Sequence, residues 1–94
     1  MEFEWDPAKA ASNLAKHGIC FAAAMRVFDD PMAVIIRDRR NYGGETRYQA
    51  MGAVEGVILF VSFTLRGGVH RIINARRANR RERTVYSLQT RSGP

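Results

Sequence analysis

The sequence predicts a single small α+β domain whose elements follow the order β-α-α-β-β-β-α. Apolar residues recur at helical spacing in the first third of the chain and alternate with polar residues through much of the next part, as strands do. A capped helix signal follows the last strand. We therefore expect a small antiparallel sheet packed against a helical hairpin, with the other face of the sheet partly open.

The first third contains one short strand and two helices. Residues 2–5 alternate polar and aromatic side chains, as a strand does. A helix then begins at Asp6, a favoured N-cap residue, with Pro7 at the first helical position, and it ends at Gly18. Residues 21–28 carry apolar side chains at i, i+3, i+4 and i+7, which predicts a second helix.

The pattern then changes to that of strands, which are predicted at residues 32–36, 45–51, 57–65 and 69–75. Residues 38–44 predict a mobile loop, whereas Gly67-Gly68 predicts a tight hairpin turn. Residues 57–65 are apolar on both faces, which is typical of a central strand covered on both sides. The last three strands are expected to form an antiparallel meander.

A last helix completes the domain. Asn79 is predicted to cap it, with Glu82 three residues later as the partner in a capping box. We expect Val85 and Leu88 to form the buried stripe of this helix, with Tyr86 beside it. The domain is expected to span residues 1–90, followed by a disordered tail at residues 91–94.

The charge of the chain is concentrated near its C-terminal end. The protein carries a net charge of +6, with a sequence pI of about 10.4. Eight of its 13 arginines, and only one acid, lie from Arg66 onward, whereas the whole chain has 2 lysines. The planar guanidinium suits bidentate binding of phosphate and carboxylate. This composition indicates a polyanionic partner such as a nucleic acid or an acidic protein.

Other classes of function are not indicated. With one cysteine and two histidines at no ligand spacing, neither an intrachain disulfide nor a zinc site is expected. No signal peptide or membrane span is recognisable, so we expect a cytoplasmic protein without a cofactor and without membrane contact. We find no nucleophile–base–acid triad and no phosphate-binding glycine loop. His70 is expected to be exposed.

The basic cluster divides in two. On an ideal strand, Arg71 and Arg76 face opposite sides, and they reach one site only if the strand bends. Arg80, Arg81 and Arg83 open the last helix, where the helix dipole disfavours cations. A bound anion or an acidic partner would explain them. Alternatively, they are solvated, or they pair with Glu82 or with the acids at residues 29–30.

A basic surface without metal ligands is compatible with cleavage of RNA, although this composition does not by itself identify that reaction. RNA cleaves itself when a 2′-hydroxyl attacks the adjacent phosphate. A protein needs only to align that attack, to transfer protons and to stabilise the charge that develops. Arginine, lysine, histidine and tyrosine side chains can do this without a metal ion.

The motifs of the chain resemble the BrnT toxin family over residues 2–88. The first half of the resemblance comprises Phe3, Glu4, Trp5, Asp6, Pro7, Ala8 and Lys9, then Asn13, Lys16, His17, Gly18, Ile19 and Phe21, and then Val27, Phe28, Asp29, Asp30 and Pro31. The second half comprises Glu45, Thr46, Arg47, Tyr48 and Gly52, then residues 71–78, Arg81, Glu82, Arg83 and Tyr86. One departure is Cys20, which stands where the family has a Ser or Thr cap.

The resemblance implies a RelE-like fold and a type II toxin that cleaves RNA without a metal ion and thereby blocks translation. It implies a BrnA-type antitoxin, bound in a heterotetramer or larger complex, and contact with operator DNA only through that antitoxin. By the same resemblance the catalytic residues are expected to be Lys16, His17, Arg47, Arg76 and Tyr86. The residues expected to bind RNA or a partner around them are Arg71, Arg77, Arg80, Arg81 and Arg83.

Two other interpretations stay open from the sequence. In one, the arginines only hold phosphates and the protein is a non-catalytic nucleic-acid-binding module. In the other, the basic surface mainly receives an acidic segment of the antitoxin, which is compatible with catalysis.

Overall fold

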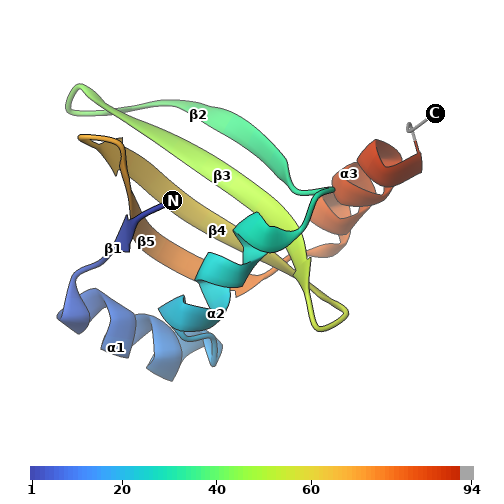
Figure 1. Cartoon of the computed structure of the whole chain (residues 1–94), viewed down its shortest axis with the longest axis horizontal. Helices are drawn as coiled ribbons and strands as arrows, with labels where there is room; N and C mark the ends of the chain where they lie inside the picture. The colour runs from blue at the N-terminus through green and yellow to red at the C-terminus, as the bar shows by residue number, and fades with distance from the viewer. Residues whose placement is uncertain (92–94) are drawn as a thin grey trace.

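The structure, a computed structural model, describes residues 1–91 and confirms the α+β class (Figure 1). Its elements are β1 (Phe3–Glu4), α1 (Pro7–His17), α2 (Phe21–Met25), the 3-10 helix η1 (Arg26–Asp29), β2 (Val34–Tyr42), β3 (Glu45–Val54), β4 (Val57–Arg66), β5 (Val69–Arg77) and α3 (Arg80–Arg91). The predicted order β-α-α-β-β-β-α counts four strands, whereas the structure has five, and each of these overlaps one of the five predicted strand ranges. Of the predicted disordered tail, Arg91 belongs to α3, and residues 92–94 lie outside the described part.

The five strands form one mixed sheet in the order β1-β5-β4-β3-β2. Four of the strands are antiparallel neighbours, but β1 pairs with β5 in parallel, with Phe3 beside His70 and Glu4 beside Arg71. The prediction of a purely antiparallel sheet was therefore wrong at this edge. The prediction that residues 57–65 form a central strand is confirmed, because β4 lies in the middle of the sheet.

The two early helices do not form the predicted hairpin. Both lie on one face of the sheet, but α1 packs against β5, while α2 continues into η1, which packs against β3 (Figure 1). With five residues, α2 is too short to pack along α1. Each helix is therefore held by the sheet, and the sheet face that they leave free is available for other contacts.

A close approach between η1 and β3 explains the glycine at position 52. A Cβ atom there would lie 2.9 Å from Cγ1 and 2.9 Å from the carbonyl oxygen of Val27, which is closer than real contacts allow. Only glycine lets the backbone of η1 rest directly on β3. This contact seats Val27 in the main core.

The predicted mobile loop at residues 38–44 is instead part of a strand. β2 runs on to Tyr42, and only Gly43 and Gly44 form the turn, with φ of +69° and +87°. Positive φ at both central residues is what a tight hairpin turn requires. The register of β2 against β3 shifts between Asp38 and Tyr42, and this irregularity interrupts the alternation that would mark a strand in the sequence.

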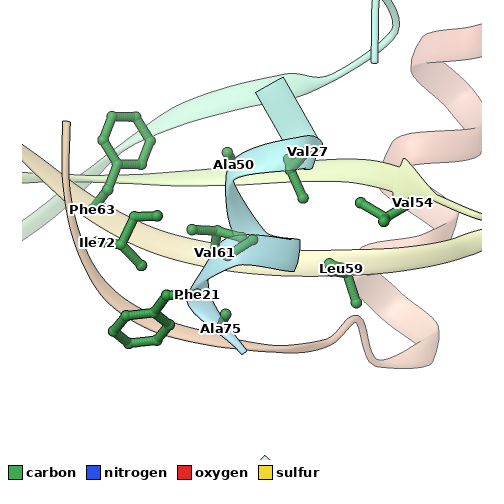
Figure 2. Packing of buried hydrophobic residues seen from close by; sticks show 10 residues of the cluster. Phe21, Val27, Ala50, Val54, Leu59, Val61, Phe63, Ile72 and Ala75 are labelled. Atoms are coloured by element: carbon green, nitrogen blue, oxygen red, sulfur yellow. The ribbon is translucent and has the colours of Figure 1, made fainter. Parts of the chain in front are cut away.

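Most of the core lies between the sheet and the helices α1, α2 and η1. Phe21 and Val27 from the helices meet Ala50, Val61 and Phe63 from the sheet (Figure 2). A smaller cluster on the opposite face joins Met51 and Phe60 to Ala78 and Tyr86. The central strand is thus covered on both faces, as predicted, but only one end of the second face is covered, by α3.

The predicted buried stripe of α3 is wrong. Val85 and Leu88 are 38% and 59% exposed, whereas Tyr86 is half-buried and packs against the second cluster. The reason is a long-range contact, because the Tyr86 hydroxyl donates a hydrogen bond to Asp30, at the end of η1. This bond turns the side of α3 that carries Tyr86 toward the sheet.

His70 is likewise not exposed as predicted. Its ring lies 5.2–5.4 Å from the rings of Phe3, Phe28 and Phe63, and its Nδ1 atom is buried without a hydrogen-bond partner among the described residues. Burial lowers the pKa of this imidazole. Its place beside β1 and η1 is set by contacts that no local pattern reveals.

The free edge of β5 beyond β1 is closed by a side chain from α1. Asn13, only 6% exposed, donates to the carbonyl of Ala75 at 2.7 Å and accepts from the N–H of Ala75 at 3.1 Å. Its amide also donates to the carbonyl of Ile19 at 3.0 Å. The Asn13 amide therefore replaces a strand partner and fixes α1 against β5.

Candidate functional site

The open part of the second sheet face forms a hollow of about 490 Å³ in front of α3. Its floor comes from β3, β4 and β5, with Met51, Phe60 and Ser62 among the lining residues. Arg40 and Gln49 lie on one side of the hollow, and the residues at the start of α3 lie on the other. The hollow joins four strands and one helix that are far apart in the sequence.

A β-bulge brings two of the three arginines of β5 to this face. Arg71 lies opposite Thr64 and Arg76 lies opposite Phe60, while the register shifts between them at Ile73. Residues directly opposite each other share a face, and Thr64 and Phe60 are four residues apart on the same strand. Arg71 and Arg76 therefore point to one face, because the strand is irregular where an ideal strand would separate them.

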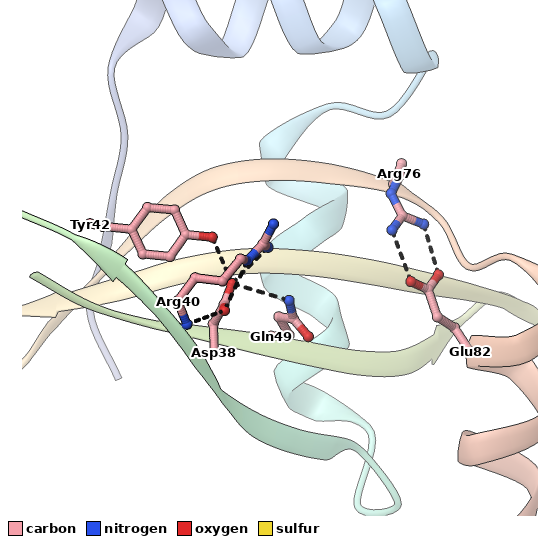
Figure 3. A network of polar contacts seen from close by, with 6 residues as sticks. All are labelled: Asp38, Arg40, Tyr42, Gln49, Arg76 and Glu82. Atoms are coloured by element: carbon pink, nitrogen blue, oxygen red, sulfur yellow. Dashed lines mark hydrogen bonds and ion pairs between the residues drawn. The ribbon is translucent and has the colours of Figure 1, made fainter.

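Arg76 is held in a fixed orientation inside the hollow. Its Nη1 and Nη2 atoms donate to the two carboxylate oxygens of Glu82 at 2.7 and 2.8 Å (Figure 3). Its guanidinium also lies 4.2 Å from the centre of the Phe60 ring. The Glu82 hydrogen bond raises the pKa of Arg76, so its charge is secure. The ring contact and the bidentate carboxylate together fix the position of the guanidinium.

Glu82 performs two tasks at once. Its Oε1 accepts from the N–H of Asn79 at 2.9 Å, while its own N–H donates to Oδ1 of Asn79 at 2.8 Å, which confirms the predicted capping box. Burial raises the pKa of Glu82, but hydrogen bonds from Arg76 and from the Asn79 N–H outweigh burial and lower it. The start of α3 is therefore rigidly coupled to Arg76.

A second arginine–carboxylate pair lies on the β2 side of the hollow (Figure 3). Asp38 accepts from Nε and Nη2 of Arg40 at 3.1 and 2.8 Å, and from the hydroxyl of Tyr42 at 2.7 Å. The hydrogen bonds from Arg40 and Tyr42 hold the pKa of Asp38 well below its usual range. The hollow is thus flanked by two cations, each held by its own carboxylate.

Arg47 stands on the same face but not among the residues that line the hollow. It lies opposite Asp38 on one side and Thr64 on the other, and its guanidinium is 4.1 Å from the centre of the Tyr42 ring. Its Nε atom is buried and has no hydrogen-bond partner among residues 1–91. A buried donor without a partner is costly, and an anion that reached this Nε would satisfy it.

Lys16 and His17 lie at the end of α1, in a separate depression of about 200 Å³ against β5. Asn74 lines both this depression and the hollow, so the two sites meet at that residue. The Asn74 amide donates to Oδ1 of Asn13 at 3.2 Å, which fixes it between them. Lys16 and His17 therefore line a depression that shares one residue, Asn74, with the hollow.

Tyr86 does not line the hollow. Its hydroxyl donates to Oδ2 of Asp30, which also accepts from the N–H of Ala53 at 2.8 Å. The hydrogen bond to Asp30, together with burial, raises the pKa of Tyr86 to about 12. In this position the phenol anchors α3 to the end of η1.

The other predicted arginines divide among different surfaces. Arg81 lines the hollow, whereas Arg80 and Arg83 line a depression of about 260 Å³ on another side of α3. Arg71 forms an ion pair with Glu4. Arg77 is exposed and lies opposite Leu59, on the face that packs against the helices. The basic cluster of the sequence is therefore not one surface.

Sequence reasoning missed the β2 side of the hollow. Asp38, Arg40 and Tyr42 were assigned to a mobile loop, and Gln49 was not singled out. The Gly43-Gly44 pair was the available signal, because a two-glycine turn predicts strands directly before and after it. The register shift in β2 determines which face of the sheet Arg40 lies on, and we identify no signal for this shift in the sequence.

Fold and site together define a class of protein. A sheet with one half-open face, lined by arginines that are already oriented, suits a phosphate-rich ligand. Among the described residues no group of three or more His, Cys, Asp or Glu side chains comes together that could hold a metal ion. None of the helices within residues 1–91 is long and apolar enough to cross a membrane. We assign the protein to the class of small domains that act on nucleic acid.

Comparison with known families makes the assignment specific. Residues 5–82 match the family described as ribonuclease toxin, BrnT, of type II toxin-antitoxin system. The match covers most of the chain, so the protein belongs to this family, as its motifs indicated. No curated protein sequence matches the chain significantly. Membership in a family of type II ribonuclease toxins implies an RNA target and an antitoxin partner.

Proposed function

We propose that this protein is a metal-independent endoribonuclease that cuts RNA in the hollow, stops translation and growth, and is neutralised by a BrnA-type antitoxin. The observation that carries the proposal is the fixed position of Arg76, which is held over the Phe60 ring by both oxygens of Glu82. A cation oriented before the substrate arrives contributes most where charge develops in a transition state.

The proposed reaction is attack of a ribose 2′-hydroxyl on the adjacent phosphate. The bond from phosphorus to the 5′-oxygen of the next nucleotide breaks, leaving a 2′,3′-cyclic phosphate and a 5′-hydroxyl. Arg76 is positioned to neutralise the extra negative charge on the phosphate during this step. Arg81, on the same wall of the hollow, and Arg47, with its unsatisfied Nε, add positive charge around the substrate.

Two protons must move in this reaction, one from the 2′-hydroxyl and one to the leaving oxygen. We assign their transfer to Lys16 and His17, which line the neighbouring depression that shares Asn74 with the hollow. Histidine is the side chain best suited to accept and release protons near neutral pH. Tyr86 is assigned to positioning, because its proton is bound to Asp30 and its pKa is raised to about 12.

RNA cleavage by the purified protein in the presence of EDTA tests the proposal. The chain offers a matched pair of variants, because Arg76→Ala and Arg77→Ala remove the same charge from neighbouring residues that face opposite sides of the sheet. We expect Arg76→Ala to lower the cleavage rate at least 100-fold and Arg77→Ala to change it less than threefold, since removing one transition-state donor costs about 10²–10³ in rate. The cleaved ends should carry a cyclic phosphate.

Other outcomes of the same assay separate the alternatives. Binding of RNA without cleavage, with or without Mg²⁺, would show that the protein is a non-catalytic nucleic-acid-binding module. Cleavage that is abolished by EDTA and restored by Mg²⁺ would contradict metal independence. Equal loss of activity in both variants would show that Arg76 acts only through net charge.

We further propose that the antitoxin binds to α3, in a heterotetramer or larger complex in the cytoplasm, and that only the antitoxin contacts operator DNA. Val85 and Leu88 are exposed on α3 beside Arg80, Arg81 and Arg83, which fits an acidic segment with apolar anchors. Co-expression with a BrnA-type antitoxin tests this, since Leu88→Asp should weaken the complex while leaving RNA cleavage by the free toxin intact.

A further inference from the structure

We propose that Arg40 is a second phosphate-binding arginine of the hollow, and that Asp38 is the residue that positions it. The proposal rests on the proposed function in one respect, namely that the ligand of the hollow is RNA. It assigns to Arg40 the phosphate next to the one held at Arg76. The substrate class is then single-stranded RNA that enters the hollow with at least two consecutive phosphates.

The geometry of the Asp38–Arg40 pair carries this inference. The side chain of Asp38 is only 8% exposed, whereas that of Arg40 is 74% exposed. Asp38 accepts the backbone N–H of Arg40 at 3.0 Å and its Nε and Nη2 atoms at 3.1 and 2.8 Å. A shielded carboxylate therefore holds three donors of an arginine whose outer N–H groups remain open to solvent and to the hollow.

Further contacts hold Asp38 in place. The hydroxyl of Tyr42 donates to its Oδ2 at 2.7 Å, and Nε2 of Gln49 approaches the same oxygen at 3.4 Å (Figure 3). Asp38 also lies opposite Arg47 in the sheet. Because side chains of β2 and β3 both fix this carboxylate, Arg40 is ordered before any ligand arrives, and the ligand does not have to supply the entropy cost of ordering it.

An ordinary surface ion pair does not have this construction. Exposed pairs lose side-chain entropy and contribute little, since both partners are free to move. Arg37 and Arg39, on the same strand, are exposed and form no ion pair with any described residue. Only Arg40 of the three lines the hollow, and only Arg40 is clamped.

The space between Arg40 and Arg76 fits a nucleotide. At about 490 Å³, the hollow falls within the range of about 300–1,000 Å³ that small-ligand pockets occupy. Its floor presents the side chains of Gln49, Ser62 and Asn74, which can hydrogen-bond to the edge of a base. Such an edge is free only in an unpaired nucleotide, which favours single-stranded over duplex RNA.

Binding is tested with a 2′-O-methyl copy of an RNA that the wild-type protein cleaves, because this copy cannot undergo the reaction. We expect Arg40→Ala to weaken its binding about tenfold, as loss of a charge-assisted phosphate contact does. The dependence of log K on log salt should become shallower by about 0.7, the value for one phosphate of a single strand. Arg39→Ala, which removes the same charge from the neighbouring residue, should leave both quantities nearly unchanged.

RNA binding and cleavage by the Asp38→Asn variant test the role of Asp38, because net charge and positioning predict opposite changes in affinity. Asp38→Asn makes the protein more positive, so electrostatic attraction alone predicts tighter RNA binding. If Asp38 positions Arg40, the variant instead binds about three- to tenfold more weakly, in the direction of Arg40→Ala. Both variants should raise KM and leave kcat within about threefold, because the phosphate that they affect is not the one that reacts.

Two results would overturn the proposal. One is an Arg40→Ala variant that matches Arg39→Ala in affinity and in salt dependence. The other is an Asp38→Asn variant that is folded, as shown by its thermal unfolding, and binds RNA more tightly. If Asp38→Asn does not fold, the comparison of Arg40→Ala with Arg39→Ala decides alone. Failure of the wild-type protein to bind or cleave RNA would instead refute the proposed function.

Discussion

Nη1 and Nη2 of Arg76 and the two carboxylate oxygens of Glu82 form a bidentate ion pair that joins the last strand to the start of the last helix. Glu82 at the same time completes the cap of α3 through Asn79. The orientation of Arg76 therefore depends on an intact α3 start. Any change to the beginning of this helix is transmitted directly to the hollow.

Replacement of Glu82 by glutamine tests this coupling. Glutamine can still serve in a capping box, but it cannot hold Arg76 by two charged oxygens. We expect Glu82→Gln to cleave RNA about tenfold more slowly, although the lost negative charge by itself favours RNA binding. Glu55→Gln, at an exposed turn where Glu55 pairs with Arg26, removes the same charge and is the control. Faster cleavage by Glu82→Gln would show that Glu82 keeps Arg76 from the substrate phosphate and does not orient it for catalysis.

The Tyr86–Asp30 hydrogen bond predicts a loss of stability at alkaline pH. The pKa of Tyr86 is raised to about 12 in the folded state, above the ordinary value of 10.0. A raised pKa stabilises the fold fully below the unfolded value, and this contribution is lost as pH rises from about 10 toward about 12. The free energy of unfolding in urea should fall over this range in the wild type. Tyr86→Phe should lack that part of the decline.

At neutral pH the same variant should be less stable by about 1–2 kcal/mol, because a hydrogen bond to a charged carboxylate is lost. The N–H groups of Ala53 and Met32 remain bonded to Asp30, which limits the effect. RNA cleavage should persist if Tyr86 is a positioning residue. A loss of kcat in a folded Tyr86→Phe protein would instead assign its hydroxyl to the reaction.

His70 predicts a different loss of stability, at acid pH. Burial lowers the pKa of His70, and its Nδ1 atom has no hydrogen-bond partner among the described residues. A lowered pKa means that the unfolded chain takes up this proton first, so stability falls as pH drops below the ordinary value of 6.5. His70→Phe should remove this dependence below pH 6.5. The measurement is urea unfolding of both proteins across that range.

The substitution should not damage the fold at neutral pH, since a phenyl ring suits a cluster that already contains Phe3, Phe28 and Phe63. It also removes the unsatisfied nitrogen. An unchanged pH dependence in His70→Phe would mean that another group is responsible for the acid sensitivity.

Asn13 predicts the largest effect on stability. Its amide satisfies both the N–H and the carbonyl of Ala75, so alanine at this position leaves two buried backbone groups without partners. We expect Asn13→Ala to cost about 2–4 kcal/mol of unfolding free energy. Ser12→Ala, one residue away on an exposed side of α1, should change stability by less than about 0.5 kcal/mol. Equal stability of the two variants would contradict the edge-closing role of Asn13.

Features that depend on neighbouring residues were predictable. The cap at Asp6 and the helix end at Gly18 are set by local hydrogen bonds, and the structure shows both. The capping box of Asn79 and Glu82 is confirmed for the same reason. The central position of β4 followed from apolar side chains on both of its faces, which is a property of the segment itself.

Features that depend on distant residues were not predictable. The hydrogen bond between Tyr86 and Asp30 determines which side of α3 is exposed. Aromatic rings from β1, η1 and β4 bury His70. The hydrophobic pattern of one segment cannot reveal such partners, because each lies in another part of the chain.

The sequence by itself determined the α+β class, the family and a surplus of arginine, because these follow from composition, local pattern and motif. Only the tertiary structure decided which arginines meet. A bulge in β5 turns Arg71 and Arg76 to one face. Arg40 lies within the register shift of β2 and lines the hollow. Strand periodicity assumes a regular strand, and a single extra residue reverses the face of every side chain that follows it.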